Sequence, residues 1–125
     1  MKKGTTIFWL AIALLIVGGI AGSVYLKMRP GQLDSFAQCI ADSGATYYGA
    51  FWCPHCQAQN RLFGNSKQYL PYVECSTPDG RGQTDVCIEQ EIASYPTWEF
   101  ADGERFTGEL TLAQLSERTG CELPE

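Results

Sequence analysis

The sequence predicts one small α/β domain, a mixed central sheet flanked by helices, that is preceded by one transmembrane helix. Three observations lead to this prediction. The 125-residue chain has room for one domain and not two. No charge occurs between Lys3 and Lys27. The rest of the chain alternates between helical and strand-like patterns in the order α-β-α-β-α-β-β-α. We therefore expect an anchor at residues 1–29 and a domain at residues 30–125.

The apolar segment at residues 4–26 is long enough to cross a bilayer. As a helix it would span about 34 Å, whereas the hydrocarbon layer is about 30 Å thick. A cleaved signal peptide is the alternative, because Lys2 and Lys3 form a basic start and small residues stand at positions 21–23. The apolar stretch is longer than that of a usual signal peptide, which favours an uncleaved anchor. The flanking basic residues are balanced and leave the orientation open.

The soluble part is strongly acidic. All fourteen acidic residues lie at or after Asp34, whereas four of the nine basic residues precede Pro30. Such a domain repels phosphate backbones, so nucleic acid is not an expected partner. The hydrophobic fraction of 45 % predicts a folded core rather than a disordered chain.

The helices of the domain are indicated by apolar residues at helical spacing and by residues that start or stop a helix. Gly44 stops the first helix, and Gly64 predicts a kink or an early end in the second. Thr84 could cap the third, and a capping box of Thr111 and Gln114 opens the last. The predicted ranges are 33–44, 57–67, 84–94 and 111–120.

The strands are β-prone runs bounded by turn residues. The first is continuous rather than alternating, which is typical of a buried strand. Asp102 and Gly103 form a two-residue hairpin turn between the last two strands, and residues 76–82 read as an exposed loop. The predicted ranges are 45–51, 72–75, 97–101 and 104–108.

A C-x-x-C motif, Cys53-Pro54-His55-Cys56, stands between the first strand and the second helix. Two thiols at this spacing can close a small disulfide ring. The unpaired N–H groups and the positive end of the helix dipole favour the thiolate of Cys53. Pro54 suits the first helical turn, and His55 can add positive charge or a hydrogen bond near the Cys53 sulfur. A stabilised thiolate makes the disulfide more oxidising.

Two other chemistries are less well supported by the residues. A zinc site would need a second pair of ligands, but eleven residues, and not two, lie between Cys75 and Cys87, and His55 is the only histidine. A cysteine hydrolase would need a histidine outside the motif as its general base. We therefore expect no metal and no organic cofactor, because the Cys53–Cys56 pair itself carries the two electrons.

Several segments together resemble the thioredoxin fold: Tyr48 to Cys56, Leu62-Phe63-Gly64, Tyr72 to Cys75, and Tyr95-Pro96-Thr97-Trp98. Within it, the chain is most similar to the thioredoxin-like domain that is fused to bacterial vitamin K epoxide reductase homologues. The resemblance covers about residues 33–121. It implies that Cys53 is the nucleophile, Cys56 the resolving thiol and Pro96 a cis-proline facing them. Tyr95 and Thr97, beside it, would offer backbone to a substrate. We expect Trp52 at the rim and Trp98 in the core.

The sequence departs from thioredoxin in two respects. Tyr47 stands where thioredoxin has a buried acid that helps to deprotonate the resolving thiol. Glu74 is a candidate substitute, although a solvated glutamate at a strand end is the simpler expectation. The motif interior is Pro-His, as in periplasmic dithiol oxidases, and not the Gly-Pro of reducing thioredoxins.

Four cysteines remain outside the motif and allow three pairings. The resemblance implies a disulfide between Cys75 and Cys87, which leaves Cys39 to pair with Cys121. The alternative is that some are buried free thiols. An even number of cysteines outside the active pair favours an oxidising compartment.

These observations predict a single-pass cell-membrane protein whose domain faces outward and exchanges disulfides with client proteins. Oxidation of client thiols, with electrons passed to a quinone-linked membrane partner of the vitamin K epoxide reductase type, is the favoured function. An extracytoplasmic reductase fed by a membrane electron carrier is the first alternative. A non-enzymatic binding module or zinc domain is the second.

Overall fold

The computed structural model describes residues 2–125. It consists of two compact units, and the boundary between them in the sequence lies between Pro30 and Gly31. The first unit holds helix α1 (Lys2–Met28). Within the described residues, its segment Lys3–Met28 is the one helix that is long and apolar enough to cross a membrane. By length and composition it qualifies as a membrane anchor or as a signal sequence.

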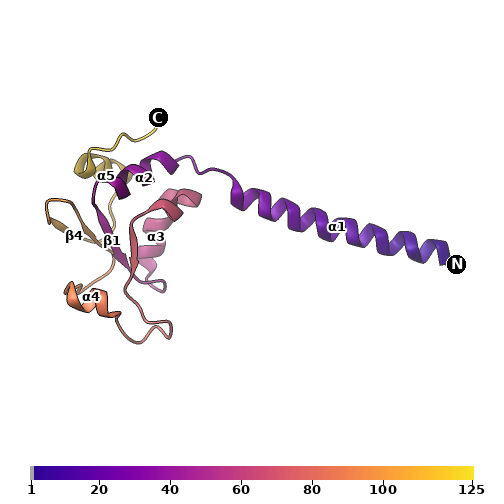
Figure 1. Cartoon of the computed structure of the whole chain (residues 1–125), viewed down its shortest axis with the longest axis horizontal. Coiled ribbons are helices and arrows are strands. Elements are labelled where there is room, and N and C mark those ends of the chain that lie inside the picture. Colours follow the sequence, from indigo (N-terminus) through magenta and orange to yellow (C-terminus); the bar gives the residue numbers. More distant parts are fainter. Residues whose placement is uncertain (1) are drawn as a thin grey trace. The chain divides into compact units, whose positions relative to one another are not determined.

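The second unit is built on a four-stranded mixed sheet with the strand order β2-β1-β3-β4 (Figure 1). The central strand β1 runs parallel to β2 and antiparallel to β3, and β3 continues into β4 as a hairpin. The parallel pair requires a crossover connection, which the helix after β1 supplies. The strands are β1 (Thr46–Gly49), β2 (Tyr72–Glu74), β3 (Thr97–Glu99) and β4 (Arg105–Thr107).

Helices accompany this sheet, as the sequence predicts. Figure 1 shows α2 and α5 together at one end of the domain and α4 at the other. A disulfide between Cys39 and Cys121 joins α2 to the tail that follows α5. The helices are α2 (Asp34–Asp42), α3 (Pro54–Phe63), the 3₁₀ helix η1 (Gly64–Tyr69), α4 (Asp85–Glu89) and α5 (Leu112–Thr119).

The main core lies between the sheet and helices α2, α3 and α5. At its centre, Tyr47 of β1 stacks on Trp98 of β3 with ring centroids 4.5 Å apart, and both side chains are fully buried. This pair crosses the sheet at a position where the two residues face each other in register. The other buried members of the cluster are Phe36, Ala37, Ile40, Ala45, Phe63, Leu70, Phe100, Leu110, Leu115 and Cys121.

A buried amide fixes α3 against the segment that leads into α5. Gln59 of α3 is fully buried, and its Nε2 donates to the carbonyl of Leu110 at 2.9 Å. The amide N–H of Leu110 donates in return to Gln59 Oε1 at 2.7 Å. Both polar ends of the side chain are therefore satisfied inside the core, and the helix that carries the C-x-x-C motif is held in one position.

The predicted element order and fold class are confirmed, whereas several boundaries are corrected. The motif helix begins at Pro54, and it ends at Phe63 because Gly64 takes φ = 53° and the chain continues as η1. Helix α4 covers five residues instead of the predicted eleven. Thr84 makes no side-chain cap there, since its hydroxyl donates to the carbonyl of Glu74. All four strands are shorter than predicted.

Candidate active site

The two cysteines outside any disulfide, Cys53 and Cys56, lie where β1 gives way to α3. The Cys53 amide donates to the carbonyl of Ala50 at 3.1 Å, which closes a tight turn after the strand. Cys53 is the N-cap residue of α3 and Pro54 occupies the first helical turn, where its missing N–H is not needed. The Cys53 side chain therefore stands at the positive end of the helix dipole, beside the unpaired N–H groups of the first turn.

The peptide bond between Tyr95 and Pro96 is cis, and it faces the thiol pair. The Cys53 thiol lies 3.6 Å from the carbonyl oxygen of Tyr95 and donates to it. Pro96 is fully buried, and the partly buried Tyr95 side chain packs against the cluster of Ala50, Cys53 and Cys56. The Thr97 side chain points into the interior, where its hydroxyl donates to the carbonyl of Ser94 at 2.8 Å.

Cys56 lies one turn further along α3 and is almost fully enclosed, with 1 % of its surface exposed against 5 % for Cys53. The pKa of Cys56 is raised to about 12, chiefly by burial; a hydrogen bond with the backbone of Ala50 opposes the shift, and interaction with the neighbouring Cys53 adds to it. At neutral pH Cys56 is thus a protonated thiol. This asymmetry suits a pair in which Cys53 attacks and Cys56 resolves.

Two exposed aromatic side chains stand beside the thiols. Trp52 keeps 48 % of its surface exposed, and its Nε1 donates to Ser76 Oγ at 2.9 Å. Its ring meets that of Tyr95 edge to face, with centroids 6.1 Å apart. Phe51, which the sequence analysis did not single out, is 52 % exposed. These side chains give the site an apolar rim on which part of another protein can pack.

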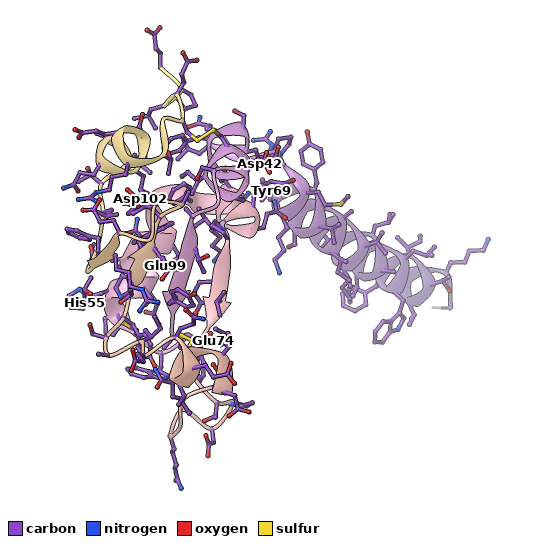
Figure 2. The ribbon with its side chains drawn as sticks, turned by 60° about the vertical axis from the view of Figure 1, so that its left-hand side comes forward. Asp42, His55, Tyr69, Glu74, Glu99 and Asp102 are labelled. Carbon is purple, nitrogen blue, oxygen red and sulfur yellow. A yellow bond between two sulfur atoms is a disulfide. The ribbon has the colours of Figure 1, made fainter. Side chains whose placement is uncertain are left out.

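His55 is directed away from the sulfur and toward Glu109. Its Nδ1 lies 2.7 Å from Glu109 Oε1, and both side chains are exposed. Figure 2 shows the labelled His55 at the outer surface of the domain. No hydrogen bond from His55 to Cys53 is among those of the described residues, so any effect on the thiolate acts through charge. Glu109 was not predicted, because it is 54 residues away in the sequence.

Glu74 corrects the expectation of a solvated residue at a strand end. Its carboxylate is half-buried and accepts hydrogen bonds from the Tyr72 hydroxyl at 2.8 Å and from the amides of Ser76 and Phe51 at 2.9 and 3.2 Å. Alternation along β2 places Tyr72 and Glu74 on one face, a signal that could have indicated the pair. Figure 2 labels Glu74 near the end of its strand, well separated from His55.

The remaining four cysteines form two disulfides. Cys75 is joined to Cys87, with their Cα atoms 5.5 Å apart, and Cys39 to Cys121, with theirs 5.9 Å apart. The first closes the loop that carries Ser76, the residue that holds the Trp52 indole. Within residues 2–125, no cluster of three or more histidine, cysteine or acidic side chains is suited to a metal ion.

A mixed four-stranded sheet with a dithiol at the start of the first crossover helix and a cis-proline opposite it defines a thioredoxin-like fold. No family model matches the chain. A thiol-disulfide oxidoreductase of Arabidopsis thaliana is 38 % identical over 96 residues, which cover 73 % of this chain and 25 % of that protein. A Drosophila melanogaster protein named thioredoxin domain-containing protein 5 homolog is 31 % identical over 106 residues, which cover 71 % of this chain and 25 % of that protein.

The chain thus spans about a quarter of the length of these curated relatives. Together with the fold, the two relatives show that the chain belongs to a thioredoxin-like family.

Proposed function

We propose that this chain is a membrane-anchored, extracytoplasmic thiol-disulfide oxidoreductase that oxidises the thiols of client proteins. The observation that carries the proposal is the placement of Cys53. It caps α3, touches the Tyr95 carbonyl beside the cis-proline, and lies next to a rim of exposed aromatic rings. The redox function of the relatives supports the same chemistry. No cofactor is needed in this proposal, because the Cys53–Cys56 disulfide accepts both electrons.

The reaction proceeds by two exchanges. A client thiolate attacks Cys53 Sγ, the Cys53–Cys56 bond breaks, and Cys56 leaves with the electron pair and takes up a proton. A second client thiolate then attacks the client sulfur of the mixed disulfide, and Cys53 leaves as a thiolate. The client gains a disulfide, and the domain is left as a dithiol two electrons richer. The Tyr95 carbonyl and the rim of Phe51 and Trp52 would hold the client chain during these steps.

The oxidising direction is supported by two features. The Cys75–Cys87 and Cys39–Cys121 disulfides suit an oxidising compartment. The interior of the motif is Pro54-His55, as in periplasmic dithiol oxidases, and not the Gly-Pro of reducing thioredoxins. Re-oxidation then needs an electron acceptor. We propose a quinone-linked membrane protein of the vitamin K epoxide reductase type, as implied by the resemblance at residues 48–56 and 95–97.

Helix α1 gives this partnership a physical basis. As an uncleaved anchor it would hold Cys53 near the outer face of the membrane, where the partner's own cysteines would lie. Tethering raises the effective concentration of the two proteins to the millimolar range, so that a small docking surface suffices.

One experiment tests orientation and electron flow together. Right-side-out membrane vesicles from the native cell, carrying the full chain, are reduced, washed and labelled with a membrane-impermeant maleimide before and after addition of quinone. Cys53 should be labelled in sealed vesicles before quinone and protected after it. The Cys53→Ser/Cys56→Ser variant controls for other thiols. Labelling that requires lysis would contradict the orientation, and labelling that persists with quinone would favour a reductase.

A further inference from the structure

The thiol-disulfide exchange proposed above requires Cys56 to gain or lose a proton in each turnover. Its side chain is nonetheless 1 % exposed. With its pKa raised to about 12, chiefly by burial, Cys56 is a protonated thiol at pH 7. Solvent therefore has little access to the Cys56 sulfur, and this sulfur carries a proton at neutral pH. A protein group that exchanges protons with Cys56 would remove this obstacle.

Four titratable groups face Cys56 in the described structure: Cys53, Tyr47, Tyr72 and, beyond Tyr72, Glu74. Cys53 is the reacting partner and cannot serve as the base. The Tyr47 hydroxyl donates to the Cys56 carbonyl at 3.1 Å and also interacts with the Cys56 side chain, but Tyr47 is fully buried and therefore cannot pass a proton to solvent itself. Tyr72 is half-buried, and its hydroxyl is hydrogen-bonded to the Glu74 carboxylate. Tyr72 is therefore the group that can pass a proton between Cys56 and the surface.

The Tyr72 hydroxyl and the Cys56 sulfur both border the space that a side chain on Gly49 would fill. A Cβ placed on Gly49 would lie 3.1 Å from Cys56 Sγ, 3.3 Å from the Tyr72 hydroxyl oxygen and 2.7 Å from Tyr72 Cε2. Any larger residue would therefore displace the tyrosine ring. Because Gly49 has no side chain, no atom of residue 49 separates the hydroxyl from the thiol on this side of the strand.

The carboxylate of Glu74 is fixed at the outer end of this arrangement. The Tyr72 hydroxyl donates to Glu74 Oε2 at 2.8 Å, and Glu74 Oε1 accepts from the backbone amides of Phe51 and Ser76. These amides hold the carboxylate in one orientation. Burial and the hydrogen bond to Glu74 raise the pKa of Tyr72, so its hydroxyl stays protonated and passes a proton on only as it receives another.

We propose that Tyr72 and Glu74 form a proton relay that serves Cys56. As Cys56 attacks a mixed disulfide on Cys53, its proton passes to the Tyr72 oxygen while the Tyr72 proton passes to Glu74. Tyr72 is unchanged at the end, and Glu74 has gained the proton. When Cys56 is the leaving group, in the oxidising direction, the proton returns along the same path. The relay would thus do for Cys56 what a buried acid does in thioredoxin, at a position that Tyr47 occupies in this chain.

The test isolates the Cys56 step with glutathione disulfide as oxidant. The Cys53 thiolate of the reduced full chain attacks glutathione disulfide, giving a Cys53–glutathione mixed disulfide and one glutathione thiolate. Cys56 then attacks Cys53 Sγ, the Cys53–glutathione bond breaks, a second glutathione thiolate leaves, and Glu74 holds the proton of Cys56. Acid quenching and mass spectrometry measure the mixed disulfide over time.

Glu74→Gln should slow the second step about 100-fold at pH 7, the lower end of the range for general-base catalysis. The amide oxygen can still accept from Phe51 and Ser76, so the fold is kept. The rate of the wild-type step should change little with pH between about 6.5 and 8.5, whereas that of the variant should rise about tenfold per pH unit, because hydroxide must then remove the proton. Tyr72→Phe should match Glu74→Gln, and the double variant should be no slower.

Two controls separate a relay from a structural effect. Glu99→Gln removes another half-buried strand carboxylate, paired with Arg105 instead of a tyrosine, and should leave the second step unchanged. In a Cys56→Ser background, Glu74→Gln should leave the rate of Cys53 glutathionylation unchanged. Equal rates and pH profiles in wild type and Glu74→Gln would overturn the relay while leaving the proposed function intact. A wild-type chain that forms no Cys53–Cys56 disulfide would overturn the proposed function as well.

Discussion

Cys56→Ser should convert the chain from an enzyme that turns over into one that accumulates mixed disulfides through Cys53. Cys53 keeps its place at the start of α3 and can still attack a client disulfide. Without the second thiol, the covalent complex has no internal route to release. Turnover should fall to the uncatalysed background, and higher-mass species that collapse on reduction should appear on non-reducing gels.

The matched variant, Cys53→Ser, should lose turnover equally but trap nothing, because the buried, protonated Cys56 is a poor nucleophile. The variant with both replacements defines the background. Trapping by Cys53→Ser and not by Cys56→Ser would reverse the two assignments.

Removal of the Cys39–Cys121 disulfide should produce the largest loss of stability in the domain. The two cysteines are 82 residues apart, and in the chain-entropy model a loop of that size is worth about 4.5 kcal/mol. The Cys75–Cys87 disulfide closes a loop with a sequence separation of 12, worth about 3 kcal/mol. Urea unfolding of the two double-alanine variants, with Cys53 and Cys56 retained, measures both free energies.

The two losses should also differ in kind. Opening the Cys75–Cys87 loop frees Ser76 and with it the Trp52 indole, so this variant should bind clients less well than its stability alone explains. Opening the Cys39–Cys121 link leaves the site untouched. A larger loss of stability from the shorter loop would show that packing, and not loop entropy, dominates.

Features of the fold that depend on neighbouring residues could be predicted from the sequence. Thr111 and Gln114 form the capping box that their spacing indicates, and Gly120 ends α5 with φ = 72°. Trp98 is in the core, and Trp52 is at the surface beside the thiols. Each of these depends on a short segment and on the general position of apolar residues.

Features that depend on distant contacts could not be predicted. Helix α4 is short because the chain leaves the helix at Glu91, which takes φ = 54°, and the Ile92 amide donates back to the Cys87 carbonyl; neither feature is visible as periodicity. The partner of His55 comes from 54 residues away. From its local sequence, Glu74 is expected to be a solvated residue at the end of a strand. In the fold, the amide of Phe51, 23 residues away, donates to its carboxylate.

The reduction potential of the Cys53–Cys56 pair tests the central claim most directly. The full chain is equilibrated with glutathione buffers of known ratio, and the fraction of oxidised pair is read by alkylation and mass spectrometry. A thiol oxidase of the kind proposed should give a potential near −120 mV, as strongly oxidising disulfide proteins do. A value near −270 mV, typical of reducing thioredoxins, would contradict the oxidase and favour electron flow toward clients.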